Sequence, residues 1–251
     1  MRFLVFSDVH ANLTALKASL AAAEGHWDEA ACLGDLVGYA PWPNEVVEML
    51  RDRGIHGVAG NYDSTVATDY KHCGCRYEDP RQEELSHLSY AWTRAHVSPD
   101  TKGFLGTLPF RIDLRPAGGH VAGPTVTLLH GNQVLNTVYV TADRSNDFLS
   151  TMGNAVSARP GDVVAFGHTH KPWHRVVDGV HFVNTGSVGR PKDGDWRAGY
   201  VALSVQSGGV IVDFRRVEYD VERAADAILE SPLPHEFASY LRSGGTSLAA
   251  V

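Results

Sequence analysis

Five short apolar runs, each followed within a few residues by glycine, aspartate, asparagine or histidine, constrain the fold of this chain more than any other feature. The runs cover residues 3–6, 30–33, 55–59, 125–129 and 163–166. They are followed by Asp8-Val9-His10, Gly34-Asp35, Gly60-Asn61-Tyr62-Asp63, His130-Gly131-Asn132 and Gly167-His168-Thr169-His170. Short apolar runs of this kind are typical of strands that are buried on both faces of a sheet.

The segments between these runs predict that helices alternate with the strands. Residues 12–24 have helical spacing of apolar residues, with Asn12 as the expected N-cap and Gly25 as the stop, and Pro43 begins a second helix. Residues 64–109 are polar and contain no β-rich run, and residues 82–95 have helical spacing. We therefore expect a single α/β domain over residues 1–251, in which two sheets pack face to face and residues 64–109 form a helical cap insertion.

The composition excludes several classes of protein. The chain has 251 residues, 43% of them hydrophobic and 20% charged, and a net charge of −7, which argues against nucleic acid or an anionic membrane as a partner. No apolar stretch reaches the about 18 residues of a membrane span, and the N-terminus has no signal-peptide pattern. The three cysteines have no disulfide spacing. We expect a soluble, cytoplasmic protein, and the sequence leaves its oligomeric state open.

The residues that follow the five runs have the chemistry of metal ligands. Because ligands of open α/β sheets bind beyond the carboxyl ends of the strands, we expect seven side chains to gather at one rim: Asp8, His10, Asp35, Asn61, His130, His168 and His170. Oxygen and imidazole ligands without thiolates suit Mn, Fe, Zn or Ni. One aspartate among seven ligands can bridge two ions, so the pattern predicts a binuclear site for two divalent transition-metal ions.

Each motif taken alone has a simpler interpretation. An aspartate after a strand, such as Asp8, is more often a helix N-cap, and Gly34-Asp35 and Gly60-Asn61 are ordinary turn sequences. The pair His168 and His170 is more specific, because in extended backbone the two imidazoles would lie on the same side. The metal-site hypothesis rests on the occurrence of all five motifs in this order, each after a predicted strand.

Together the motifs Asp-x-His, Gly-Asp, Gly-Asn-x-Asp, His-Gly and Gly-His-x-His, over residues 8–170, resemble those of the calcineurin-like metallophosphoesterase superfamily. Asn184-Thr185-Gly186-Ser187, followed by Arg190-Pro191, resembles the C-terminal strand and loop of its small bacterial phosphodiesterases. The resemblance implies a four-layer α/β/β/α sandwich of two mixed sheets. It also implies that one ion binds Asp8, His10, Asp35 and His170, and that the other binds Asp35, Asn61, His130 and His168, with Asp35 as the bridge.

The resemblance further implies a phosphoesterase in which a metal-bridging hydroxide attacks phosphorus, with Asp35, Asn61 and His130 in catalytic roles. We expect the substrates to be phosphodiesters of small, nucleotide-like molecules. The alternatives are a phosphomonoesterase or protein serine/threonine phosphatase and, from a different class, a catalytically weak metal-binding scaffold. The protein phosphatases and nucleases of the superfamily have a His directly after the metal-binding Asn, where this chain has Tyr62. This difference favours the small bacterial branch.

Three features leave two interpretations each. Cys73-Gly74-Cys75 is a zinc or redox motif or, more simply, a loop with two cysteines, because no second cysteine pair accompanies it. Arg190 and Lys192 either bind a substrate phosphate or are solvated loop charges. Tyr62 either protonates the leaving group or packs against the substrate or the cap, and the ordinary phenol pKa of about 10 favours packing.

Overall fold

The structure is a computed structural model that describes residues 1–77, 79–115, 123–206 and 209–246. Its strands form two five-stranded sheets. The first sheet contains, in spatial order, β10 (Gly209–Val217), β9 (Ala198–Gln206), β1 (Arg2–Phe6), β2 (Glu29–Cys32) and β3 (His56–Gly57). The second sheet contains β4 (Ile112–Leu114), β5 (Val126–Leu128), β6 (Val163–Phe166), β8 (Val180–Asn184) and β7 (Trp173–Val177).

Both sheets are mixed, as expected. In the first sheet β1, β2 and β3 are parallel, and β9 pairs antiparallel with β1. In the second sheet β5, β6 and β8 are parallel, whereas β4 and β7 pair antiparallel at the two edges. Within each sheet, the parallel strands therefore have their carboxyl ends at the same edge, where the predicted ligand motifs follow.

The alternation of side chains along the strands divides the core into layers. Phe3 and Val5 of β1 lie in one buried cluster with Val163 and Ala165 of β6, so this cluster fills the space between the sheets. The intervening residues of β1, such as Leu4, belong to a second cluster on the outer face. Because successive residues of a strand point to opposite faces, a strand buried on both sides needs an uninterrupted apolar run.

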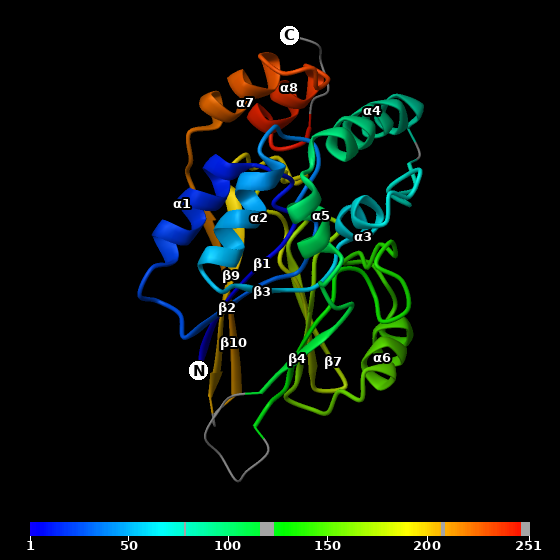
Figure 1. Cartoon of the computed structure of the whole chain (residues 1–251). Helices are drawn as coiled ribbons and strands as arrows, with labels where there is room; N and C mark the ends of the chain where they lie inside the picture. Colours follow the sequence, from blue (N-terminus) through cyan, green and yellow to red (C-terminus); the bar gives the residue numbers. More distant parts are fainter. Residues whose placement is uncertain (78, 116–122, 207–208, 247–251) are drawn as a thin grey trace.

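Helices cover the outer faces of both sheets (Figure 1). The helices α1 (Leu13–Ala23), α2 (Pro43–Asp52) and α7 (Val221–Leu229) share a buried cluster with the outer face of the first sheet. The helix α6 (Asn146–Ala155) packs on the second sheet through Leu149 and Met152. These layers confirm the predicted α/β/β/α sandwich. None of the helices in the described ranges is long and apolar enough to cross a membrane.

The start of α1 shows how local sequence positions the neighbouring loops. Asn12 is the N-cap, as predicted, and its side-chain oxygen accepts a hydrogen bond from the Ala15 backbone N–H at 3.2 Å. Its amide nitrogen donates to the Gly189 carbonyl at 3.0 Å, which ties the helix to the loop after β8. Because Asn12 supplies the cap, the side chain of Asp8 is free for another role.

The insertion expected over residues 64–109 contains the end of α3 (Asn61–Ala67), α4 (Pro80–His96) and α5 (Pro99–Leu105), and its described residues contain no strand. Residue 78 lies outside the described residues. The helix predicted over residues 82–95 is α4. Leu85 and Tyr90 of α4 and Leu105 of α5 belong to the same buried cluster as Leu4 of β1. The insertion therefore contributes to the main core of the protein.

Several elements were not predicted from the sequence. The strands β4 and β7 lie at sheet edges, and β7 alternates exposed and half-buried residues over most of its length, so it has no continuous apolar run. The helices α5 and α8 (Glu236–Arg242) have seven residues each, too few for a clear period. The third predicted strand, residues 55–59, is paired only over β3, which has two residues.

The packing of α6 on the second sheet predicts a large effect for truncating Phe182. This side chain is fully buried, and a Cβ on Gly153 of α6 would lie 3.2 Å from its ring. We expect Phe182→Ala to lower the free energy of unfolding by about 3–5 kcal/mol, because the cavity cannot fill. The matched control Phe214→Ala, at a half-exposed ring of β10, should cost no more than about 1.5 kcal/mol. Urea unfolding measures both, and equal losses would contradict the assignment of the core.

Candidate metal centre

All seven predicted ligands lie where the carboxyl edges of the two sheets meet. Asp8 and His10, Asp35 and Asn61 follow β1, β2 and β3 of the first sheet, and the other three follow β5 and β6 of the second. None of the seven is more than 4% exposed. The rim is therefore formed by two sheets together, rather than by one open sheet.

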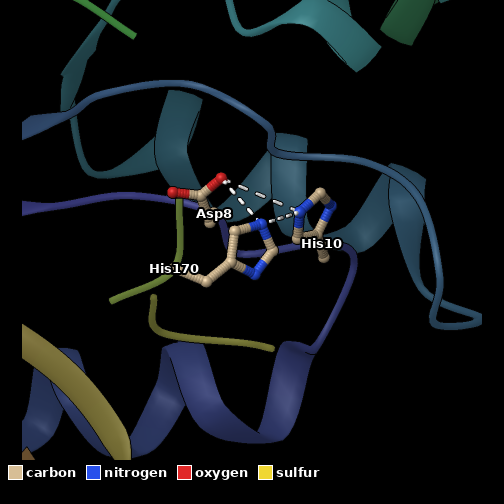
Figure 2. Close-up of side chains that lie close together, drawn as sticks. All are labelled: Asp8, His10 and His170. Carbon is tan, nitrogen blue, oxygen red and sulfur yellow. Dashed lines mark hydrogen bonds and ion pairs between the residues drawn. The ribbon is translucent and has the colours of Figure 1, made fainter. Parts of the chain in front are cut away.

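Six of these side chains form two groups of three. The first group is Asp8, His10 and His170, and the second group is Asp35, His130 and His168; within each group the candidate ligand atoms lie within 4.8 Å of one another. Figure 2 shows the first group, with the carboxylate and both imidazoles directed toward a common centre. The seventh residue, Asn61, adjoins the second group, because its Oδ1 lies 3.1 Å from His130 Nε2.

Backbone carbonyls orient three of the four imidazoles. The Nδ1 atoms donate to the carbonyls of Val37, Leu33 and Arg190 at 3.1, 2.7 and 2.5 Å, for His10, His130 and His170 respectively. A carbonyl only accepts hydrogen bonds, so each Nδ1 carries a proton and each Nε2 faces the site. This is the usual arrangement around metal-binding histidines, in which the bond to the second nitrogen fixes the tautomer and the ring.

The first group brings together atoms that repel one another unless a cation lies between them. His10 Nε2 lies 3.2 Å from His170 Nε2, and Asp8 Oδ1 lies 3.2 Å from the same nitrogen of His170. Asp8 Oδ1 is buried and has no hydrogen-bond partner, and the same is true of His168 Nε2 in the second group. Unsatisfied buried polar atoms are rare in folded proteins. The donor set therefore fits a metal ion.

Asp35 belongs to the second group and also faces the first. Its Oδ1 accepts a hydrogen bond from the Tyr62 backbone N–H at 2.9 Å. Its Oδ2 lies 3.8 Å from His10 Nε2 in the first group and 3.5 Å from His130 Nε2 in the second. A carboxylate oxygen placed between two imidazoles of different groups is suited to contact two cations at once.

The protonation states of the histidines differ. Burial lowers the pKa of His10 to about 3, with a contribution from repulsion by His170. Burial is also the main cause of the low pKa values of His168 and His170. Burial acts in the same direction on His130, but attraction to Asp35 and a hydrogen bond with it outweigh burial and raise the pKa of His130 to about 9. Three of the four imidazoles are thus neutral at pH 7, which is the form that binds metals.

Five of the seven site residues have left-handed backbone, a conformation that costs of order 1–3 kcal/mol for a residue other than glycine. The φ angles are 53° for Asp8, 47° for His10, 54° for Asp35, 66° for His168 and 59° for His170. Extended backbone was expected at the last two, so this prediction was wrong. Because the chain turns at each of them, His168 and His170 contribute to different groups.

Glycines allow the strand ends to approach this closely. A Cβ on Gly60 would lie 2.1 Å from Asp35 Oδ1, and one on Gly167 would lie 1.9 Å from Ser7 Oγ and 2.6 Å from Asp8 Oδ2. No side chain fits at either position. The glycines of these motifs therefore have a steric role in the site as well as a role in turning the chain.

Three further residues support the site, and only Ser187 belongs to a motif quoted from the sequence. Ser7 Oγ donates to Asp8 Oδ2 at 2.6 Å, and Ser187 Oγ donates to the Asp8 carbonyl at 2.7 Å. The ring of Tyr139 stacks on His168, with 4.3 Å between ring centroids. Tyr139 lies in the loop after β5, outside any motif, so no pattern in the sequence could have indicated it.

The contacts of Arg190 and Tyr62 bear on the two interpretations of each. Arg190 is only 7% exposed, and its guanidinium lies 4.0 Å from the ring centroids of both Tyr39 and Tyr240, so it is not a solvated charge. Tyr62 is 1% exposed, and its hydroxyl lies 3.2 Å from Ser86 Oγ of α4. Burial raises the pKa of Tyr62 well above its usual value. Tyr62 therefore packs against α4, and Arg190 is enclosed by aromatic rings next to the site.

The cysteines of the insertion do not complete a metal site of their own. Among the described residues, the two groups above are the only sets of three His, Cys, Asp or Glu side chains close enough to hold an ion, and neither includes a cysteine. Cys73 is buried, Cys75 is half-buried, and both thiols are free.

Comparison with known proteins agrees with the geometry. The model of the calcineurin-like phosphoesterase superfamily domain matches residues 1–208. An uncharacterized protein of Methanocaldococcus jannaschii is 28% identical, over 92% of this chain and 93% of the relative. The crystal structure of a metallophosphoesterase from Sphaerobacter thermophilus is 28% identical with a TM-score of 0.75, over 97% of this chain and 100% of that chain. A hypothetical protein from Pyrococcus horikoshii OT3 superimposes with a TM-score of 0.81 at 20% identity, over 98% of this chain and 99% of that chain.

The tight contact at Gly167 predicts that a single added methyl group disrupts the site. We expect Gly167→Ala to lower the free energy of unfolding by about 1–3 kcal/mol, because Ser7 and Asp8 must move. Gly103→Ala in α5 is the matched control, since a Cβ there meets no atom within 4 Å; it should be neutral or stabilising by up to about 1 kcal/mol. Chemical denaturation compares the two, and a tolerated Gly167→Ala would contradict the packing described.

Proposed function

We propose that this chain, which belongs to the calcineurin-like phosphoesterase superfamily, is a metal-dependent hydrolase of phosphodiester bonds in small, nucleotide-like substrates. The observation that carries the proposal is the pair of buried three-residue groups with Asp35 Oδ2 between them. A binding scaffold without activity would not need to retain every member of such a set. The preference for diesters rests on the sequence resemblance to the small bacterial phosphodiesterases.

The proposed ligands follow from the grouping. One ion would be held by Asp8, His10, Asp35 and His170, and the other by Asp35, Asn61, His130 and His168. Two divalent cations at these positions supply positive charge for the phosphate oxygens and acidify water at neutral pH. We propose that Asp35, Asn61 and His130 contribute to catalysis through this site. The chemistry of the ligands suits Mn, Fe, Zn or Ni.

The remaining residues of the site prepare it for these ions. Asp8 Oδ2 is occupied by the Ser7 hydroxyl and by the His168 backbone N–H, which lies at 2.9 Å, so only Oδ1 is free. Hydrogen bonds from Nδ1 to backbone carbonyls hold three imidazoles with Nε2 toward the site. Ligands fixed in this way lose little conformational entropy on binding, and the folded chain maintains their geometry.

Lys192 is the residue that we propose for binding the substrate phosphate. Its backbone N–H donates to the His170 carbonyl at 3.4 Å, so Lys192 adjoins the first group along the chain, and after burial its charge is the largest cause of the lowered pKa of His170. Burial lowers the pKa of Lys192 itself to about 8, which leaves most of the molecules charged at pH 7. An ammonium beside two cation-binding groups is suited to a non-bridging phosphate oxygen.

A small substrate is part of the proposal. All seven ligands are at most 4% exposed, and the choice of a small, nucleotide-like molecule rests on the sequence resemblance. We propose that the insertion of residues 64–109, within a single domain of residues 1–251, contributes to substrate choice. The three free cysteines suit a reducing compartment, so a cytoplasmic location is part of the proposal.

Metal content provides the first test. Purified protein should bind about two transition-metal ions per chain, and Asp35→Asn should bind one or none, because it removes a ligand shared by both. Hydrolysis of bis-p-nitrophenyl phosphate should fall at least roughly 100-fold in the variant. Asp162→Asn is the matched control, since Asp162 is equally buried but accepts hydrogen bonds from the Thr125 and Arg159 backbones, far from the site. Full activity after exhaustive chelation would overturn the proposal.

The position of the Tyr62 hydroxyl gives a second prediction. Because it faces Ser86 inside the protein, Tyr62→Phe should change kcat/KM by less than about threefold for aryl and alkyl phosphodiesters alike. General acid catalysis contributes about 10²–10⁴-fold where it operates. A hundredfold loss confined to alkyl esters, which have poor leaving groups, would instead identify Tyr62 as the proton donor.

A further inference from the structure

The segment Cys73-Gly74-Cys75 of the insertion contacts the metal centre through the side chain of Asn61. The Asn61 amide nitrogen donates to the Cys73 carbonyl at 3.0 Å and lies 3.1 Å from Cys75 Sγ. On its other side, Asn61 Oδ1 lies 3.1 Å from His130 Nε2. Asn61 is 1% exposed. One buried carboxamide therefore joins the insertion to the second group.

These contacts determine which end of the carboxamide faces the second group. The oxygen and nitrogen of an asparagine side chain are nearly the same size, so a half-turn about the terminal bond exchanges them at little steric cost. After such a turn, the oxygen would face the Cys73 carbonyl, and two acceptors would repel. The nitrogen would face His130, where it could not bind a cation. The carbonyl of Cys73 and the sulfur of Cys75 both favour the orientation that offers oxygen.

The segment also has contacts with other parts of the chain. Cys73 Sγ lies 3.9 Å from Ser86 Oγ of α4. Gly74 has a φ of +76°, and a Cβ there would lie 3.0 Å from the Thr137 methyl group in the loop after β5. The segment thus adjoins α4 through Cys73 and the loop after β5 near Gly74.

We propose that the Cys75 thiol and the Cys73 carbonyl are positioning groups that hold Asn61 with its oxygen toward the second group and so raise the affinity of that group for its ion. The existence of the ion rests on the proposed function, whereas the orientation of the Asn61 amide does not. Neither cysteine is itself a ligand. In this way the insertion would contribute to metal binding.

Replacement of Cys75 tests the proposal in the full-length protein. Titration of metal-free protein with Mn²⁺ should show two binding events, one of which His130→Ala abolishes. Cys75→Ala should weaken that same event about 10–100-fold, as removal of a residue that orients a ligand does, and should leave the other event unchanged. Cys75→Ser retains a hydrogen-bond acceptor and should restore the affinity to within about threefold of wild type. Lys71→Ala, at an exposed residue just before the segment, is the control and should match wild type.

A second measurement separates failure of this proposal from failure of the proposed function. In metal-free protein, the side-chain amide protons of Asn61 should exchange slowly with solvent in wild type and Cys75→Ser, and faster in Cys75→Ala, as followed by NMR. Equal exchange rates in the three proteins, or equal Mn²⁺ affinities, would overturn the positioning role. Slow exchange in a protein that binds none of Mn²⁺, Fe²⁺, Zn²⁺ and Ni²⁺ would support the positioning role and overturn the metal site.

Discussion

The burial of two carboxylates and four imidazoles at the meeting edge of two sheets is the constraint on which the rest of this structure depends. Asp8 and Asp35 are at most 2% exposed, and a buried carboxylate is unfavourable unless hydrogen bonds or cations compensate for its lost hydration. One oxygen of each carboxylate accepts hydrogen bonds from within the chain. Asp8 Oδ2 accepts from the Ser7 hydroxyl and the His168 backbone N–H, and Asp35 Oδ1 accepts from the Tyr62 backbone N–H. The other oxygens remain directed at the site, where the imidazoles converge.

This arrangement explains features that would otherwise be unfavourable. Left-handed backbone at His10, His168 and His170 turns the chain sharply after each strand, so that ligands from different strands meet. The glycines at positions 60 and 167 leave no side chain where the strand ends approach within contact distance of Asp35 and Asp8. Strained backbone conformations of this kind are common at functional sites, where the positions that the ligands require differ from the conformations that the residues prefer.

Much of this organisation could be predicted from the sequence because buried parallel strands leave a strong pattern. The run before Asp8 coincides with β1, and the ligand motifs mark the carboxyl ends of the parallel strands. The edge strands β4 and β7 could not be predicted, since half-exposed strands mix polar and apolar residues. The stacking of Tyr139 on His168 could not be predicted either, because such contacts depend on how loops distant in sequence pack together. The same holds for the enclosure of Arg190 between Tyr39 and Tyr240.

The parallel strands also give the molecule two ends of different character. The turn at residues 178–179, between β7 and β8, is exposed and lies at the end of the second sheet opposite to the metal-binding edge. Exposed turns of this kind tolerate alteration well. A cysteine introduced at Arg159, an exposed residue before β6 at the same end of the sheet, would therefore offer a point of attachment for a dye, or for coupling the protein to a sensor surface, from which the metal-binding edge would point away.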